Sequence, residues 1–139
     1  MTAKKLRVLL IEASAADARN ALARLKQGGY AVAHQQVADA AALQKALDKG
    51  DWDVVLCSHA PTGFCGLEAL ELVRKSSADL PFLFLSQDRS EESICRAIQA
   101  GANGYIFKDT LDYLGPAIEH SLREAQVRRE HNEAQLALQ

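Results

Sequence analysis

Residues 53–66 read DVVLCSHAPTGFCG, a short apolar run that opens directly into a loop rich in turn-forming residues. The run Val54–Cys57 is typical of a strand that is buried on both faces. A proline and two glycines then interrupt regular structure. In α/β proteins, binding and catalytic groups gather where such strands end. The stretch therefore predicts a parallel sheet with a candidate site beside Ser58.

Short apolar runs alternate with helical stretches along the rest of the chain. The expected strands cover residues 6–11, 30–37, 54–58, 82–86 and 104–107. Ser14, Asp39 and Ser90 are the expected N-caps of the first, second and fourth helices. The third helix is expected over residues 66–76, and the last begins near Pro116. This alternation predicts a doubly wound α/β fold, a five-stranded parallel sheet with helices on both faces.

Composition limits the classes of protein that the chain can represent. A length of 139 residues fits one domain, and a net charge of -2 gives no electrostatic reason to expect nucleic-acid binding. No apolar stretch approaches the roughly 18 residues of a membrane span, so we expect no membrane partner. Cys57, Cys65 and Cys95 are an odd number without metal-site spacing. Free thiols in a cytoplasmic protein are the expectation.

The C-terminal stretch continues as a helix beyond the expected core. Nothing breaks a helix from Pro116 to Gln139, which at about 1.5 Å per residue could extend some 36 Å. Ile118, Leu122 and Ala125 can dock on the sheet, whereas the sequence after Val127 is mostly polar. We therefore expect a compact domain over residues 1–127 and a helical extension over 128–139. The extension is either a frayed, solvated tail or a connector to a partner or a following domain, and the continuing helix pattern favours the connector.

Four segments at the ends of the expected strands resemble the CheY-like receiver domains of bacterial two-component response regulators. They are LLIEASAAD (9–17), DVVLCSHAPTGFCGLEAL (53–70), PFLFLSQ (81–87) and AGANGYIFKD (100–109). The resemblance extends from Leu6 to about Arg129. It implies the flavodoxin-like strand order 2-1-3-4-5 and a signalling role that is not enzymatic.

The resemblance also assigns residues to the pocket of such a domain. Glu12 matches the first of two acidic residues that bind Mg²⁺. Ser86 matches the hydroxyl that bonds the phosphoryl group, and Lys108 matches the lysine that pairs with it. Tyr105 matches the aromatic switch position.

Two positions depart from the family pattern, and both bear on the chemistry. Ala13 stands where the second acidic residue belongs, and Ser58 stands where the phosphoacceptor aspartate belongs. An acyl phosphate requires a carboxylate, and Mg²⁺ prefers carboxylate oxygens as ligands. Glu12 and Lys108 alone would leave the pocket with a formal charge near zero. We therefore expect a degenerate receiver, or pseudo-receiver, without a cofactor and with Mg²⁺ binding lost.

The expected mode of action is contact with a protein partner or with a covalently linked output domain. The resemblance places the contact face on the fourth helix, the fifth strand and the last helix; its candidate residues are Ile94, Ala97, Tyr105 and Leu122. A homodimer through the C-terminal helix is a further possibility.

Three alternatives remain open at this point. The first is a receiver that is phosphorylated at an unusual acceptor. The second is a small enzyme with Ser58 as nucleophile and His59 as base, which is disfavoured because adjacent strand residues point in opposite directions. The third is a redox role for Cys57 and Cys65, which is disfavoured because no basic residue adjoins Cys57.

Overall fold

The computed structural model describes residues 4–12, 14–58, 66–76 and 80–137. Its parallel strands are β1 (Lys4–Ile11), β2 (Tyr30–Val37), β3 (Val54–Ser58), β4 (Phe82–Ser86) and β5 (Gly104–Phe107), in the order β2-β1-β3-β4-β5. The helices are α1 (Ala15–Gln27), α2 (Ala40–Lys49), α3 (Gly66–Ser76), α4 (Glu91–Gln99), the 3-10 turn η1 (Leu111–Tyr113) and α5 (Leu114–Ala137). The predicted fold class, strand order and long C-terminal helix are confirmed.

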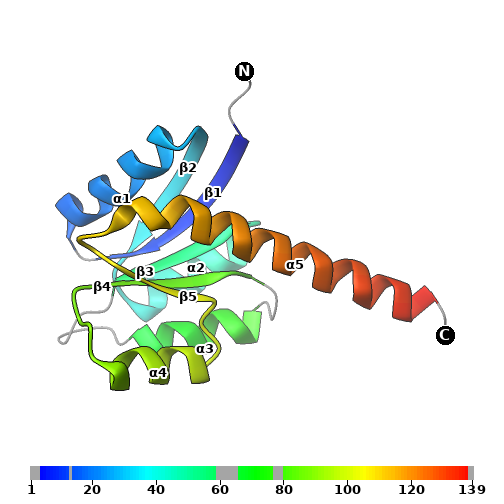
Figure 1. The fold of residues 1–139 in the computed structure, drawn as a ribbon. Coiled ribbons are helices and arrows are strands. Elements are labelled where there is room, and N and C mark those ends of the chain that lie inside the picture. Colours follow the sequence, from blue (N-terminus) through cyan, green and yellow to red (C-terminus); the bar gives the residue numbers. More distant parts are fainter. Residues whose placement is uncertain (1–3, 13, 59–65, 77–79, 138–139) are drawn as a thin grey trace.

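Two hydrophobic layers cover the sheet, one on each face (Figure 1). Alternate residues of β1 point to opposite faces, so that Leu9 and Ile11 join one layer and Val8 and Leu10 the other. Helices α2, α3 and α4 cover the first face, and α1 and α5 cover the second. The central strands β1, β3 and β4 are therefore buried on both sides, as their continuous apolar sequences predict.

Local signals explain where the helices begin and end. The Ser14, Asp39 and Ser90 side chains accept hydrogen bonds from the backbone N–H groups three residues ahead, which confirms all three predicted N-caps. Gly29 follows α1 with a φ of 97°, a backbone conformation that side chains with a Cβ rarely adopt.

The start of the last helix agrees with the sequence-based expectation that Pro116 lies in its first turn. Helix α5 begins at Leu114, and η1 precedes it. Pro116 is thus the third residue of the helix, where a missing N–H removes no intrahelical bond. No helix in the described ranges is both long enough and apolar enough to span a bilayer.

Helix α5 is continuous across the predicted boundary between residues 127 and 128. Among the α5 side chains that the structure describes, Ala125 is the last buried one, and Val127 is 63% exposed. Figure 1 shows the far end of the helix projecting away from the sheet. The part of α5 beyond Ala125 therefore lacks the support of the core.

Trp52 and Cys57 take the packing roles that their sequence contexts predicted. The Trp52 indole packs against the first layer and donates a hydrogen bond to the Ala46 carbonyl at 2.8 Å. Cys57 is 1% exposed and belongs to the same layer, whereas Cys95 is an exposed free thiol. Cys65 and His59 lie outside the described residues, so the structure does not test the redox role considered for Cys65 or the role of His59 as a base.

Candidate functional site

The carboxyl ends of β1, β3, β4 and β5 lie along one edge of the sheet, as the parallel topology requires (Figure 1). Glu12 directly follows β1, Ser58 and Ser86 are the last residues of β3 and β4, and Lys108 directly follows β5. The Lys108 N–H donates to the Ser86 carbonyl at 2.9 Å, which continues the β4–β5 pairing past the strand ends. Ala13 lies outside the described residues.

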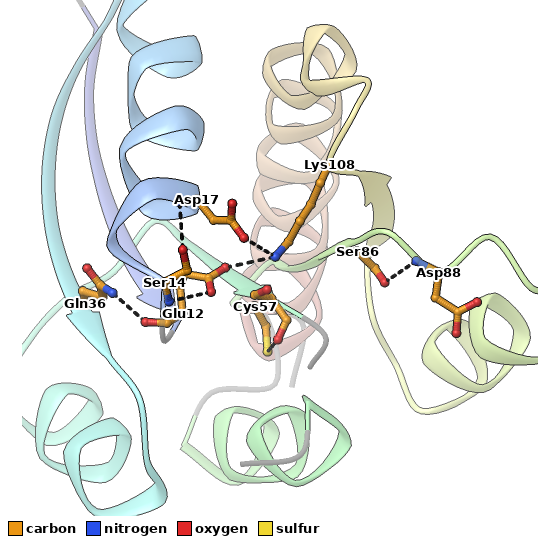
Figure 2. Close-up of polar contacts among 9 residues, drawn as sticks. Glu12, Ser14, Asp17, Gln36, Cys57, Ser86, Asp88 and Lys108 are labelled. Atoms are coloured by element: carbon orange, nitrogen blue, oxygen red, sulfur yellow. Dashed lines mark hydrogen bonds and ion pairs between the residues drawn. The ribbon is translucent and has the colours of Figure 1, made fainter. Parts of the chain in front are cut away.

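The Glu12 side chain is buried and held on several sides. One carboxylate oxygen, Oε1, accepts a hydrogen bond from the Ser14 N–H at 2.9 Å, and the other, Oε2, lies 3.4 Å from Lys108 Nζ (Figure 2). The Gln36 side chain donates to the Glu12 carbonyl at 2.6 Å. Only 7% of the Glu12 side chain is exposed, so the Lys108 ammonium is a counter-charge that it needs.

Asp17 is a member of the site that the sequence analysis missed. Its N–H donates to Ser14 Oγ at 3.3 Å, as the predicted cap requires. Its carboxylate also accepts a hydrogen bond from Lys108 Nζ at 2.8 Å, shorter than the distance from that atom to Glu12 (Figure 2). Helices that begin at the carboxyl ends of strands place their first turn beside the site. That rule could have found Asp17.

The ion-pair cluster changes the charge balance expected from the sequence. Glu12 and Asp17 each carry one negative charge and share one ammonium, which gives a formal charge of about −1 in place of the expected value near zero. A small pocket of about 30 Å³ is lined by these three side chains together with Asn20, Ala21, Leu85 and Leu111. That volume suits about one water molecule and lies far below the roughly 300 Å³ of small-molecule pockets. Within the described ranges, no three His, Cys, Asp or Glu side chains are grouped to hold a metal ion.

Ser58 and Ser86 form the uncharged part of the same edge. Ser58 is half-buried, and its hydroxyl has no hydrogen-bond partner among the described residues. Ser86 is 1% exposed, and its hydroxyl accepts a hydrogen bond from the Asp88 N–H at 3.0 Å. The structure therefore brings Glu12 and Lys108 together, whereas the Ser86 hydroxyl is turned toward the segment that follows β4 (Figure 2).

Asp88 links the segment after β4 to its surroundings. Its carbonyl accepts a hydrogen bond from the Tyr105 hydroxyl at 2.8 Å, which places the predicted switch aromatic against this segment. Its carboxylate accepts from the Ser90 N–H at 2.9 Å and from the Ser93 hydroxyl at 2.6 Å. The segment between β4 and α4 is therefore tied both to β5 and to the first turn of α4.

Arg89 provides a second tie between the same segment and the end of β5. Its guanidinium donates twice to the Asp109 carboxylate and lies 4.2 Å from the centre of the Phe107 ring. Hydrogen bonding to Arg89 lowers the pKa of Asp109 below its ordinary value.

The predicted contact face is only partly on the surface. Ile94, Tyr105 and Leu122 are half-buried. Ala97 is 3% exposed and belongs to the core, so its assignment to the contact face was wrong. A small residue at this position lets α4 approach the sheet, while Ile98 is 50% exposed.

Residues 8–117 match the family described as response regulator receiver domain. The chain is 34% identical over 76 residues to chemotaxis protein CheY-3 of Vibrio cholerae, a match that covers 53% of this chain and 58% of that protein. It is also 34% identical over 71 residues to the bacterioopsin transcriptional activator of Halobacterium salinarum, covering 51% of this chain and 10% of that protein. The chain thus spans less than two thirds of either relative.

The solved structure of NtrX from Brucella abortus has a similar fold. It matches 94% of this chain with a TM-score of 0.82 at 21% sequence identity, and the matched part is 30% of that chain.

Proposed function

Because the chain belongs to the response regulator receiver domain family of two-component systems, we propose that it is a pseudo-receiver that acts by protein contact without aspartyl phosphorylation. The single observation that carries the proposal is Ser58 at the end of β3. In the family pattern this position holds the aspartate that accepts the phosphoryl group. A serine hydroxyl is not a carboxylate and forms no acyl phosphate.

The ion-pair cluster supports the loss of metal binding. Mg²⁺ takes an octahedral shell of oxygen ligands that usually includes one or two carboxylates. Ala13 supplies no side-chain ligand, and both Glu12 and Asp17 are engaged by Lys108. The residues present therefore do not fit Mg²⁺. In this proposal Lys108 is the permanent counter-charge of the pocket.

The contacts of Asp88 support a contact face that is formed without a bound phosphoryl group. Tyr105, the proposed switch aromatic, is already bonded to the segment after β4, and Arg89 holds that segment to Asp109. Ile94, Tyr105 and Leu122 remain our candidate contact residues on this face. Its occupant would be a protein partner or a linked output domain in the cytoplasm, reached through the extension of α5 beyond residue 127.

The relative lengths support the linked-domain version of this proposal. The matched part of the bacterioopsin transcriptional activator is 10% of that protein, so most of it lies outside the receiver-like segment. A homodimer through the projecting part of α5 is a second way in which that helix could be covered.

The competing function is phosphorylation at an unusual acceptor, for which the half-buried Ser58 hydroxyl is the obvious candidate. A small enzyme is less well supported, because the Ser58 hydroxyl has no base bonded to it among the described residues. We include neither in the proposal.

Metal-dependent stabilisation tests the proposal. A ligand at a hundredfold excess over its dissociation constant stabilises the folded state by about 2.7 kcal/mol, or roughly 5–10 °C in a domain of this size. We expect no shift in the melting temperature of the wild-type protein with millimolar Mg²⁺ and beryllofluoride. A shift of that size in the wild-type protein would overturn the proposal.

Restoring variants sharpen the same experiment. Ser58→Asp regains the acceptor without the second acidic ligand, and Ala13→Asp regains that ligand without an acceptor. We expect both single variants to remain unresponsive. The double variant rebuilds both groups beside Ser86 and Lys108, and we expect it alone to be stabilised.

A further inference from the structure

Strand β2 is an uncovered edge of the sheet. All eight of its residues, Tyr30–Val37, pair in continuous parallel register with β1 on one side. On the other side it has no neighbouring strand in the described part of the chain. Ala31 and residues 33–36 are exposed, so the middle of the strand is open to solvent on both faces.

The sequence of β2 lacks the usual protection of an edge strand. YAVAHQQV contains no proline, lysine, arginine, aspartate or glutamate. Natural edge strands are blunted by such residues, by bulges or by shortness, because unpaired backbone groups otherwise recruit another strand. The opposite edge, β5, has only four residues, and Arg89 covers the Phe107 ring beside it. The β2 edge therefore lacks the short length and the charged cover that protect the β5 edge from pairing with another strand.

The backbone groups that face outward from β2 can be identified. Glu12 N–H donates to the Val37 carbonyl at 3.0 Å, so the polar groups of Val37 face β1. Alternation along a strand then directs the N–H and C=O groups of Val32, His34 and Gln36 away from β1. These outward donors and acceptors form a regular row with no partner strand in the described part of the chain.

Charges at the two ends of β2 favour one direction of pairing. The exposed side chains of Lys26 and Lys5 lie near the beginning of β2, since Lys26 is in the last turn of α1 and Lys5 is paired with Ala31. Asp39 lies two residues beyond the end of the strand and is exposed. An antiparallel neighbour of identical sequence brings the basic end of each copy beside the acidic end of the other, whereas a parallel neighbour would place like charges together.

From these observations we propose that two copies of this chain associate by antiparallel pairing of their β2 strands, which joins the two sheets into one. The two-fold axis passes between the two copies of Ala33. In this register His34 lies opposite Val32 of the other copy, so their outward groups form hydrogen bonds, and Tyr30–Gln36 is paired throughout. The small Ala33 side chains meet at the close central pair. This proposal does not depend on whether the pocket at the carboxyl ends of the strands can be phosphorylated.

Sedimentation of the full chain tests the interface. We expect a concentration-dependent mass that approaches twice 15.1 kDa. His34→Pro removes an outward N–H but none of the hydrogen bonds to β1, and it should leave only the 15.1 kDa species. His34→Val keeps the backbone donor and should still dimerise. Val127→Lys alters the projecting part of α5 and should also leave the dimer intact. A wild-type protein that stays monomeric, or a dimer lost only with Val127→Lys, would overturn the proposal.

Cysteine cross-linking tests the register and does not depend on how well the proline variant folds. In a background with Cys65→Ser and Cys95→Ser, we expect Ala33→Cys to form a covalent dimer on mild oxidation. Opposed residues of such a central pair have Cα atoms about 4.5 Å apart, within the range of a disulfide. Gln35→Cys is the matched control, because in this register its two copies are about four residues out of step, roughly 13 Å apart. Equal cross-linking of both variants, or of neither, would contradict the interface.

Discussion

The two halves of the pocket edge differ in how their polar groups are satisfied. On the β1 and β5 side, Glu12, Asp17 and Lys108 form a charged cluster in which each group has a partner. On the β3 and β4 side, Ser58 and Ser86 are uncharged, and only Ser86 has a hydrogen bond from a described residue. The charged half is compensated by its own ion pairs within the folded chain. The uncharged half marks where the family's chemistry requires a carboxylate.

This difference separates residues that contribute to stability from residues that serve only the phosphorylation chemistry. Removing one member of a buried ion pair leaves the other charge without compensation, so the cluster is difficult to lose one residue at a time. A phosphoacceptor has no such role in stability. Under the pseudo-receiver proposal, the acceptor can be absent while the lysine is retained for stability, which agrees with Ser58 and Lys108 in this chain.

The largest effect is expected for Lys108→Met. This change leaves Glu12 buried without its counter-charge and should lower the free energy of unfolding by about 2–3 kcal/mol. Urea denaturation at neutral pH measures it, and Lys5→Met, at an exposed lysine, is the control that should change little. A loss of under about 0.5 kcal/mol from Lys108→Met would mean that the cluster has no structural role.

Asp17→Asn tests whether the aspartate acts through Lys108. Because Asp17 is 38% exposed and partly screened by solvent, we expect a loss of about 1 kcal/mol. The same substitution in a Lys108→Met background should cost almost nothing, because the partner is already gone. Equal losses in both backgrounds would show that Asp17 contributes in another way.

Ser86→Ala and Ser58→Ala compare the two uncharged positions directly. Ser86→Ala leaves the Asp88 N–H without its acceptor and should lower stability by about 1 kcal/mol. Ser58→Ala removes a hydroxyl that has no partner among the described residues, so a change within about 0.5 kcal/mol is expected. A larger loss from Ser58→Ala would reverse the comparison.

Tyr30→Phe is expected to have the smallest effect on stability at neutral pH. Tyr30 is the first residue of β2 and lies at the end of the sheet opposite the pocket. Burial, and then the nearby Glu119 carboxylate, raise the pKa of Tyr30 from 10.0 to about 12. The neutral phenol is thus favoured in the folded state. Its contribution is complete below pH 10 and is lost as the pH rises toward 12. The difference in melting temperature between wild-type protein and Tyr30→Phe should therefore shift against the wild type as the pH rises from 10 to about 12. A constant difference would contradict the raised pKa.

The fold could be predicted from the sequence because its signals are local. Apolar runs located the central strands β1, β3 and β4, and Ser14, Asp39 and Ser90 located three helix starts. Each signal depends on neighbours within a few residues, so it survives without knowledge of the tertiary structure.

The missed features all depend on contacts between distant elements. Asp17 reaches Lys108 across 91 positions of sequence, and Asp88 meets Tyr105 across 17. Ala97 was assigned to the contact face from the family resemblance, and its burial depends on how closely α4 packs against the sheet. The positions of Glu12 and Lys108 could be predicted because strand ends meet in a parallel sheet. Asp17, the third member of the cluster, was missed because it lies in the first turn of α1 and not at a strand end.

The central claim is tested most directly by incubating the wild-type protein with acetyl phosphate and Mg²⁺ and measuring its intact mass. A receiver domain that carries the acceptor aspartate, treated in parallel, verifies that the reagent is active. We expect the mass of this chain to stay unchanged at 15.1 kDa. A gain of one phosphoryl group, located by peptide mapping at Ser58 or a neighbouring residue, would contradict the pseudo-receiver proposal and establish phosphorylation at an unusual acceptor.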